Sequence, residues 1–129
     1  MKVLALDYGA ARTGVAVSDA TGTIVRPLGV VARASSESGL AELGTIVREH
    51  EAELVVVGMP LTLRGERGEQ AIETEAFVEA LRAVVEAPVE TYDERFTTAL
   101  AVRSGGGADE DARAAAHLLE SYLEHAGRR

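Results

Sequence analysis

A change in hydrophobic period near residue 35 constrains the fold more than any other feature of this 129-residue chain. Before it, three short apolar segments (residues 2–8, 14–18 and part of 23–32) follow one another across glycine-containing turns. This pattern predicts three strands in an antiparallel meander. Pro27 falls inside the third segment, which predicts an interruption or a bulge in that strand.

After residue 35, helical spacing and strand-like runs alternate. Apolar residues recur at helical spacing over residues 40–50, and Ser35 or Ser36 is the expected N-cap. The continuous apolar run at 54–57 is typical of a strand buried on both faces. The remaining predicted elements are a helix that buries Phe77, Ala80, Leu81 and Val84, a strand at 88–92, a short helix at 97–102 ended by three glycines at 105–107, and a final helix at 110–126 that buries Ala115, Leu118, Leu119 and Tyr122.

The order of these elements predicts the fold class. Three strands are followed by helix, strand, helix, strand and two helices, which describes a mixed α/β sheet with helices on its faces. This is the ribonuclease H-like arrangement, with five strands of which three are antiparallel and two parallel. In that fold the first strand lies centrally, beside the fourth. We expect residues 1–129 to form a single domain of this kind.

Composition narrows the class of protein. The chain has no cysteine, which excludes disulfides and thiolate metal sites. It has no apolar run near 18 residues and opens on a strand pattern, so we expect neither a membrane span nor a signal peptide. The absence of cysteine fits a cytoplasmic location. The net charge is −8 and Lys2 is the single lysine. Because nucleic-acid-binding domains are usually basic, binding phosphates here would require local arginine clusters or metal ions.

Asp7 and Asp111 are acids in positions that are expected to be buried. Asp7 ends an apolar strand, where a charge costs free energy unless it is paired, hydrogen-bonded or bound to a metal. Asp111 lies four residues before Ala115 and seven before Leu118, so it falls on the buried stripe of the final helix. Asp111 could equally be a first-turn acid that interacts with the helix dipole. Both interpretations stay open for Asp111.

The pair Asp93-Glu94 follows the fifth predicted strand. Alternation sends the two side chains to opposite faces, so only one of them is expected to reach the site. The other would bind an arginine or cap the helix near Thr97, and alternation does not decide between them. Arg95 is next to the pair and is expected to contact phosphate or to be the ion-pair partner of these acids. Three carboxylates without histidine or cysteine favour Mg²⁺ or Mn²⁺, and two such ions would support metal-assisted phosphodiester hydrolysis.

Other arginines are candidates for binding nucleic acid. Arg12 lies between Gly9 and Gly14, where backbone could approach a phosphate closely. Glycines at such positions are more often simply turn residues. Arg64 and Arg67 lie in a glycine-containing loop that could clamp nucleic acid, although a solvated loop is the more common explanation.

Four ordered segments resemble a known family. They are residues 7–19, 56–61, 92–98 and 111–123. In order and spacing these segments resemble the YqgF/RuvX family, the Holliday junction resolvase-like proteins that are also described as pre-16S ribosomal RNA nucleases. The resemblance covers essentially the whole chain.

The resemblance implies a bacterial cytoplasmic nuclease with a ribonuclease H-like fold. It carries the metal-binding and catalytic acids of the family onto Asp7, the Asp93-Glu94 pair and Asp111, with Glu94 favoured as the metal-facing member of the pair. Relatives usually have a longer segment, rich in lysine and arginine, where this chain has residues 103–110. We expect the short segment to weaken binding to junctions.

The first functional hypothesis is therefore a nuclease that processes the 5′ end of pre-16S ribosomal RNA or acts on single-stranded or branched nucleic acid. A homodimer would be required for junction resolution, which needs two sites. The alternative is a non-catalytic nucleic-acid-binding or protein-binding module with the same fold. An actin-like phosphotransferase shares the Asp-x-Gly opening but needs a second lobe. The choice between RNA and DNA and the mode of cleavage stay open.

Overall fold

The computed structural model describes residues 1–61, 64–96 and 108–126. The elements found there are β1 (Val3–Asp7), β2 (Arg12–Ser18), β3 (Val25–Ala32), α1 (Glu37–Glu49), β4 (Leu54–Met59), α2 (Glu69–Arg82), β5 (Val89–Asp93), the 3₁₀-helix η1 (Glu94–Phe96) and α3 (Ala108–Ala126). The short helix expected at 97–102 and the glycines at 105–107 lie outside the described residues. The last helix begins at Ala108, two residues earlier than expected.

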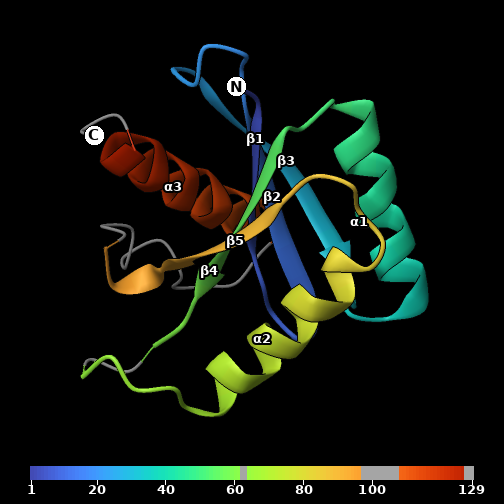
Figure 1. Ribbon diagram of the computed structural model, residues 1–129, viewed down its shortest axis with the longest axis vertical. Helices are drawn as coiled ribbons and strands as arrows, with labels where there is room; N and C mark the ends of the chain where they lie inside the picture. The colour runs from blue at the N-terminus through green and yellow to red at the C-terminus, as the bar shows by residue number, and fades with distance from the viewer. Residues whose placement is uncertain (62–63, 97–107, 127–129) are drawn as a thin grey trace.

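The five strands form one mixed sheet in the order β3-β2-β1-β4-β5. The first three strands pair antiparallel as a meander, and β1 and β4 pair parallel, as do β4 and β5. The predicted fold class and the central place of β1 beside β4 are confirmed. Because β1 and β4 are parallel and adjacent, their carboxyl ends meet at one edge of the sheet, the lower edge in Figure 1.

Helices cover both faces of the sheet. Figure 1 shows α3 on one face and α1 and α2 on the other. Alternation along β1 separates the two cores: Leu4 and Leu6 pack with the α1 and α2 side, whereas Val3 and Ala5 pack with α3. All four side chains are at most 1% exposed, as expected for the central strand of a sheet covered on both faces.

The edge strand β3 contains the irregularity that Pro27 predicts. Val15 pairs with Gly29 but Ala16 pairs with Pro27, so Leu28 is an extra residue on β3. This is a β-bulge, and it lets proline occupy an edge strand.

The helices follow the predicted spacing with one correction. Ser36, and not Ser35, caps α1 by accepting a hydrogen bond from the backbone N–H of Gly39 at 3.0 Å. The prediction that Val84 is buried on the second helix is wrong, because α2 ends at Arg82 and Val84 is 44% exposed. The buried face of α2 consists of Ala71, Thr74, Phe77, Val78 and Leu81. Within residues 1–61, 64–96 and 108–126, none of the helices has the length and apolar character needed to cross a membrane.

Candidate active site

Asp7 lies at the carboxyl end of the central strand and is nearly buried. Only 8% of the residue is exposed, although its side chain is a carboxyl group. It has the same strand phase as Val3 and Ala5, so it faces the side of the sheet that α3 covers. In the antiparallel ladder it pairs with Gly14 on β2. On the other side of β1, Leu6 pairs with Val57 of β4. Extending this parallel register by one residue places Gly58 beside Asp7. Asp7 is therefore flanked by a glycine on each neighbouring strand.

Gly14 lets the start of α3 approach the sheet. A Cβ atom added at this glycine would lie 1.9 Å from the backbone oxygen of Asp111, far inside any van der Waals contact. Since opposite residues in an antiparallel pair have Cα atoms about 4.5–5.5 Å apart, Asp111 is brought close to Asp7. The strand expected at residues 14–18 begins two residues earlier, at Arg12, so Gly14 lies inside β2. Its role is clearance for a helix.

Asp111 is paired with Arg12 across this contact. Its Oδ2 lies 2.8 Å from Nε of Arg12, and the two side chains are 27% and 43% exposed. Arg12 lies two residues before Gly14 on β2, so its side chain points to the same face of the sheet, the face that α3 covers. Oδ2 is itself buried, yet no hydrogen-bond donor is directed at it, so the contact with Arg12 is an ion pair without a well-aligned hydrogen bond. Asp111 is also in the first turn of α3, with Asp109 and Glu110, so both interpretations made from the sequence describe it.

Glu94 lies over the other glycine beside Asp7. A Cβ atom added at Gly58 would lie 2.8 Å from Oε1 of Glu94 and 2.9 Å from its Cγ. Gly58 follows Val56 with a period of two, and Val56 packs against α3, so the Glu94 side chain lies on the same face of the sheet as Asp7. A glycine inside a buried apolar strand is a recognised sign of close approach by another group, and this signal was present in the sequence.

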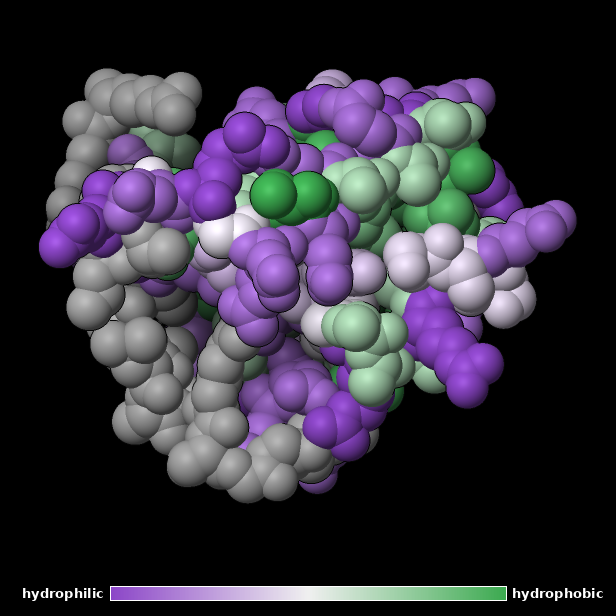
Figure 2. Space-filling view, turned by 90° about the horizontal axis from the view of Figure 1, so that it is seen from below, coloured by the Kyte–Doolittle hydropathy of each residue, from purple (hydrophilic) through white to green (hydrophobic). Residues whose placement is uncertain are grey.

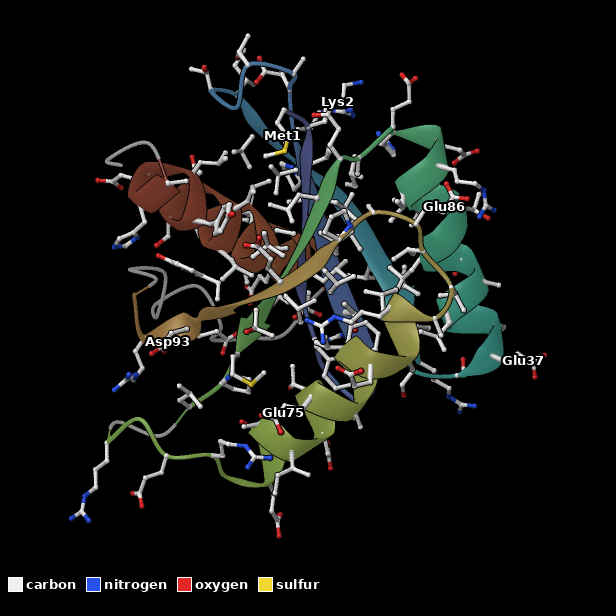
Figure 3. The ribbon with its side chains drawn as sticks, viewed as in Figure 1. Met1, Lys2, Glu37, Glu75, Glu86 and Asp93 are labelled. Carbon is white, nitrogen blue, oxygen red and sulfur yellow. The ribbon has the colours of Figure 1, made fainter. Side chains whose placement is uncertain are left out.

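Asp93 is used differently from Glu94. Both of its carboxylate oxygens accept hydrogen bonds from the guanidinium of Arg95, and Oδ1 also accepts the backbone N–H of Arg95 at 2.9 Å, at the start of η1. The hydrogen bonds from Arg95 hold the pKa of Asp93 below its ordinary value, and they raise the pKa of Arg95. Figure 3 shows Asp93 at the end of β5. Asp93 thus binds an arginine, one of the two roles expected for the other acid of this pair, and accepts the first backbone N–H of a 3₁₀ turn; the helix near Thr97 that it was expected to cap lies outside the described residues.

The loop before α2 lies against Arg95. A Cβ atom added at Gly65 would lie 3.2 Å from a terminal guanidinium nitrogen of Arg95, and Arg64 precedes Gly65 in the chain. Arg64 and Arg95 therefore belong to one edge of the sheet. Arg67 lies further along and is paired with Glu75 of α2, with Nε donating to Oε2 at 2.9 Å.

Tyr92 is a residue near this site that the sequence analysis did not assign. Its hydroxyl lies 2.8 Å from Oγ of Ser121 and also contacts Nδ1 of His125, and its ring packs edge-on against Tyr122 at 5.6 Å. These contacts attach the end of β5 to the last turns of α3. Since Glu94 follows Tyr92 by two residues, these contacts also help to fix the position of the Glu94 backbone.

The acids are gathered at one edge of the sheet without forming a closed cluster. Asp7, Glu94 and Asp111 lie on the same face, the first between the other two. In the part of the chain that the structure describes, however, no three histidine, cysteine, aspartate or glutamate side chains lie close enough together to hold a metal ion. Figure 2, seen from this edge, shows hydrophilic side chains over much of the surface. Carboxylates supply oxygen ligands, and Arg12, which contacts Asp111, supplies a positive charge that suits phosphate.

Comparison with known proteins identifies the family of this chain. The chain matches the family described as RuvX: Holliday junction resolvase over residues 1–125. A protein of Chloroflexus aggregans (strain MD-66 / DSM 9485) named "Putative pre-16S rRNA nuclease" is 44% identical over 99 residues, which cover 77% of this chain and 70% of that protein. A protein of the same name from Chloroflexus aurantiacus (strain ATCC 29366 / DSM 635 / J-10-fl) is 40% identical over 131 residues, covering 95% of this chain and 86% of that protein.

A solved structure shares the fold. The structure described as T. thermophilus RuvC in complex with Holliday junction substrate superposes with a TM-score of 0.62 at 19% identity, covering 98% of this chain and 96% of that chain. RuvC has a ribonuclease H-like fold, which agrees with the sheet order found here. With a family match over almost its whole length and curated relatives well above 30% identity, this chain belongs to the RuvX Holliday junction resolvase family, a family of nucleases.

Proposed function

We propose that the protein is a divalent-metal-dependent nuclease of the cytoplasm, in which Asp7, Glu94 and Asp111 bind two Mg²⁺ or Mn²⁺ ions. The proposed substrate is the 5′ end of pre-16S ribosomal RNA, in line with the names of the relatives. The observation that carries the proposal is the pair of glycines beside Asp7: Gly14 makes room for Asp111 and Gly58 makes room for Glu94. The space beside Asp7 is filled by the backbone of Asp111 over Gly14 and by the side chain of Glu94 over Gly58, and the presence of an acidic residue on both sides favours a functional site.

The residues fit a hard divalent cation. The candidate ligands are all carboxylates, which Mg²⁺ and Mn²⁺ prefer. A buried Oδ2 of Asp111 without a directed hydrogen bond is the kind of atom that a bound ion satisfies. When bound, two such ions would activate water and stabilise the leaving oxygen of a phosphodiester.

The surrounding residues would bring a phosphodiester to this edge. Because the chain carries a net charge of −8, a phosphate approaching the acids meets repulsion unless cations offset it. We assign this role to Arg12, which contacts Asp111, and to Arg64 and Arg95, which belong to the same edge of the sheet. Asp93 would orient Arg95 through their hydrogen bonds. Arg67 is expected to contribute less, because it lies further along the loop and is held by Glu75 of α2.

The direct test is cleavage of RNA, single-stranded DNA and four-way junctions in the presence of Mn²⁺. Asp7→Asn should abolish cleavage, and EDTA should abolish it in the wild type. Asp19→Asn is the matched control, since Asp19 is committed to a turn by hydrogen bonds from Thr21 and from the backbone of Thr23. It should remain active. Retained cleavage by folded Asp7→Asn protein would refute the proposal.

A second candidate is a non-catalytic module that binds nucleic acid or protein. The observation that favours it is the acidic balance of the chain, with 21 Asp and Glu against 13 Lys and Arg. A non-catalytic module should bind the nucleic acids of the same panel without cleaving any of them, and Mn²⁺ should have no effect. Junction resolution would in addition require a homodimer, which a solution mass measured with and without junction DNA would detect.

A further inference from the structure

The ion pair between Arg12 and Asp111 has a consequence for metal binding. It joins the start of β2 to the first turn of α3, and its 2.8 Å separation brings a positive charge to one of the three candidate ligands. The carboxylate oxygen involved, Oδ2, is buried, and the guanidinium is close to it without a well-aligned hydrogen bond. A cation at this oxygen is thus held mainly by charge, which a metal ion supplies at least as well.

We propose that Arg12 is a positioning residue that acts as a counter-cation for Asp111 in the metal-free protein and is displaced from Oδ2 when a divalent metal binds. The inference rests on the proposed metal site and adds a competition at that site. Before the metal binds, Arg12 holds the Asp111 side chain against the sheet. Arg12 also weakens the apparent affinity for the metal, because the ion pair between Arg12 and Asp111 must break when the metal binds.

Two features of the structure support this inference. The backbone of Asp111 is packed against Gly14, so its carboxylate stays beside Arg12, and a metal ion that takes Oδ2 as a ligand would compete with the guanidinium for this oxygen. The Arg12 side chain is 43% exposed, so it has solvent into which it can turn when it leaves.

The displaced arginine would then face the substrate. Its guanidinium binds phosphate oxygens well, with planar paired donors. Binding of the metal would thus release Arg12 from Asp111 and make it available to a phosphate of the substrate, in the same step that makes the site able to cleave. The acidic chain would gain a local cation for its substrate only in the loaded state.

The test is the affinity for Mn²⁺ alone, measured by calorimetry on wild type and Arg12→Gln in the absence of nucleic acid. An exposed ion pair contributes about 0.5–1 kcal/mol, so removing the competitor should tighten Mn²⁺ binding about two- to fivefold. Arg82→Gln is the matched control: it removes an arginine that is also paired, with Glu79, but on α2 and away from Asp7. It should leave the affinity at the wild-type value. Arg12→Lys, which keeps the charge, should also stay near wild type.

A metal-free measurement completes the test. In EDTA, Arg12→Gln should lower the melting temperature, and it should have no such effect when Asp111 is already changed to Asn. Unchanged or weaker Mn²⁺ binding by Arg12→Gln, with normal binding by the wild type, would overturn the inference alone. Absence of Mn²⁺ binding in the wild type would overturn the proposed metal site, and the inference with it.

Discussion

The contact between Gly14 and the start of α3 allows a sharp prediction for Gly14→Ala. The added Cβ atom would lie 1.9 Å from the backbone oxygen of Asp111 and 2.5 Å from its carbonyl carbon. An ordinary contact begins near 3.4 Å, so the helix and the strand must separate by about 1.5 Å. Neither side can yield by rotating a side chain, because the backbone fixes the position of a Cβ atom and the group that it meets is a backbone carbonyl.

The expected cost of this separation is large for a single methyl group. Overpacking a well-packed core costs about 1–3 kcal/mol, and the alanine recovers only about 0.4–1 kcal/mol through the unfolded chain. For a domain of this size a net loss of about 1–2 kcal/mol corresponds to a melting temperature lower by roughly 3–10 °C. Moving Asp111 by about 1 Å should also reduce cleavage by roughly 100-fold, the sensitivity of a positioned group.

Gly44→Ala is the matched control for this substitution. Gly44 lies inside α1, and a Cβ atom there would lie 3.5 Å from Nη1 of Arg48 and 3.7 Å from the backbone oxygen of Val84, both ordinary contacts. Since glycine inside a helix is less stable than alanine by about 0.5–1 kcal/mol, this variant should melt higher than the wild type. The two variants should therefore shift the melting temperature in opposite directions, as followed by circular dichroism. A Gly14→Ala protein as stable and as active as the wild type would refute the reasoning.

Three further substitutions separate stability from function. Gly58→Ala places a Cβ atom 2.8 Å from the flexible end of Glu94. It should therefore lower the free energy of unfolding by only about 1 kcal/mol or less, while weakening Mn²⁺ binding in a titration. Asp93→Asn should lower stability at neutral pH. Its pKa is depressed in the folded state by Arg95, so the stabilisation is present above the ordinary value of 3.8 and is lost as the pH falls through the depressed pKa; melting curves of the variant and the wild type should therefore converge in that acidic range. Tyr92→Phe removes a hydroxyl 2.8 Å from Ser121 and should cost about 1 kcal/mol in melting experiments without changing Mn²⁺ affinity, and a large change in affinity would contradict its structural role.

The fold was predictable from the sequence because its signals are local. Alternation along β1 assigned Asp7 to the same face as Val3 and Ala5, and helical phase pointed Asp111 toward the sheet. Element order then implied the sheet topology, since the run at 54–57 had to lie beside another buried strand. The end of α2 was predicted less well, because the stripe continues to Val84 in sequence although the helix stops at Arg82.

The details of the candidate site depend on contacts between distant residues, and these were not predictable. Whether Asp93 or Glu94 turns toward α3 depends on the space over Gly58, on another strand, and on the hydrogen bonds that Arg95 gives to Asp93. The pairing of Arg12 with Asp111 joins residues almost at opposite ends of the chain. Single-sequence periodicity contains no information about such pairs. The glycines were visible, but their role as clearance for a helix and for a carboxylate required the packed structure.

The bulge in β3 has a consequence for how copies of this protein can associate. An outer strand with free backbone groups is a template on which another chain can extend the sheet. Here the outer strand carries Pro27, which has no N–H to offer, and the extra residue Leu28 locally interrupts its regular pleat. Continuous strand addition along this side is therefore blocked over the middle of β3. Any stable assembly of two copies should use the outer faces of the helices or the other edge strand, β5. The protein should also resist the edge-to-edge growth that leads to fibrils.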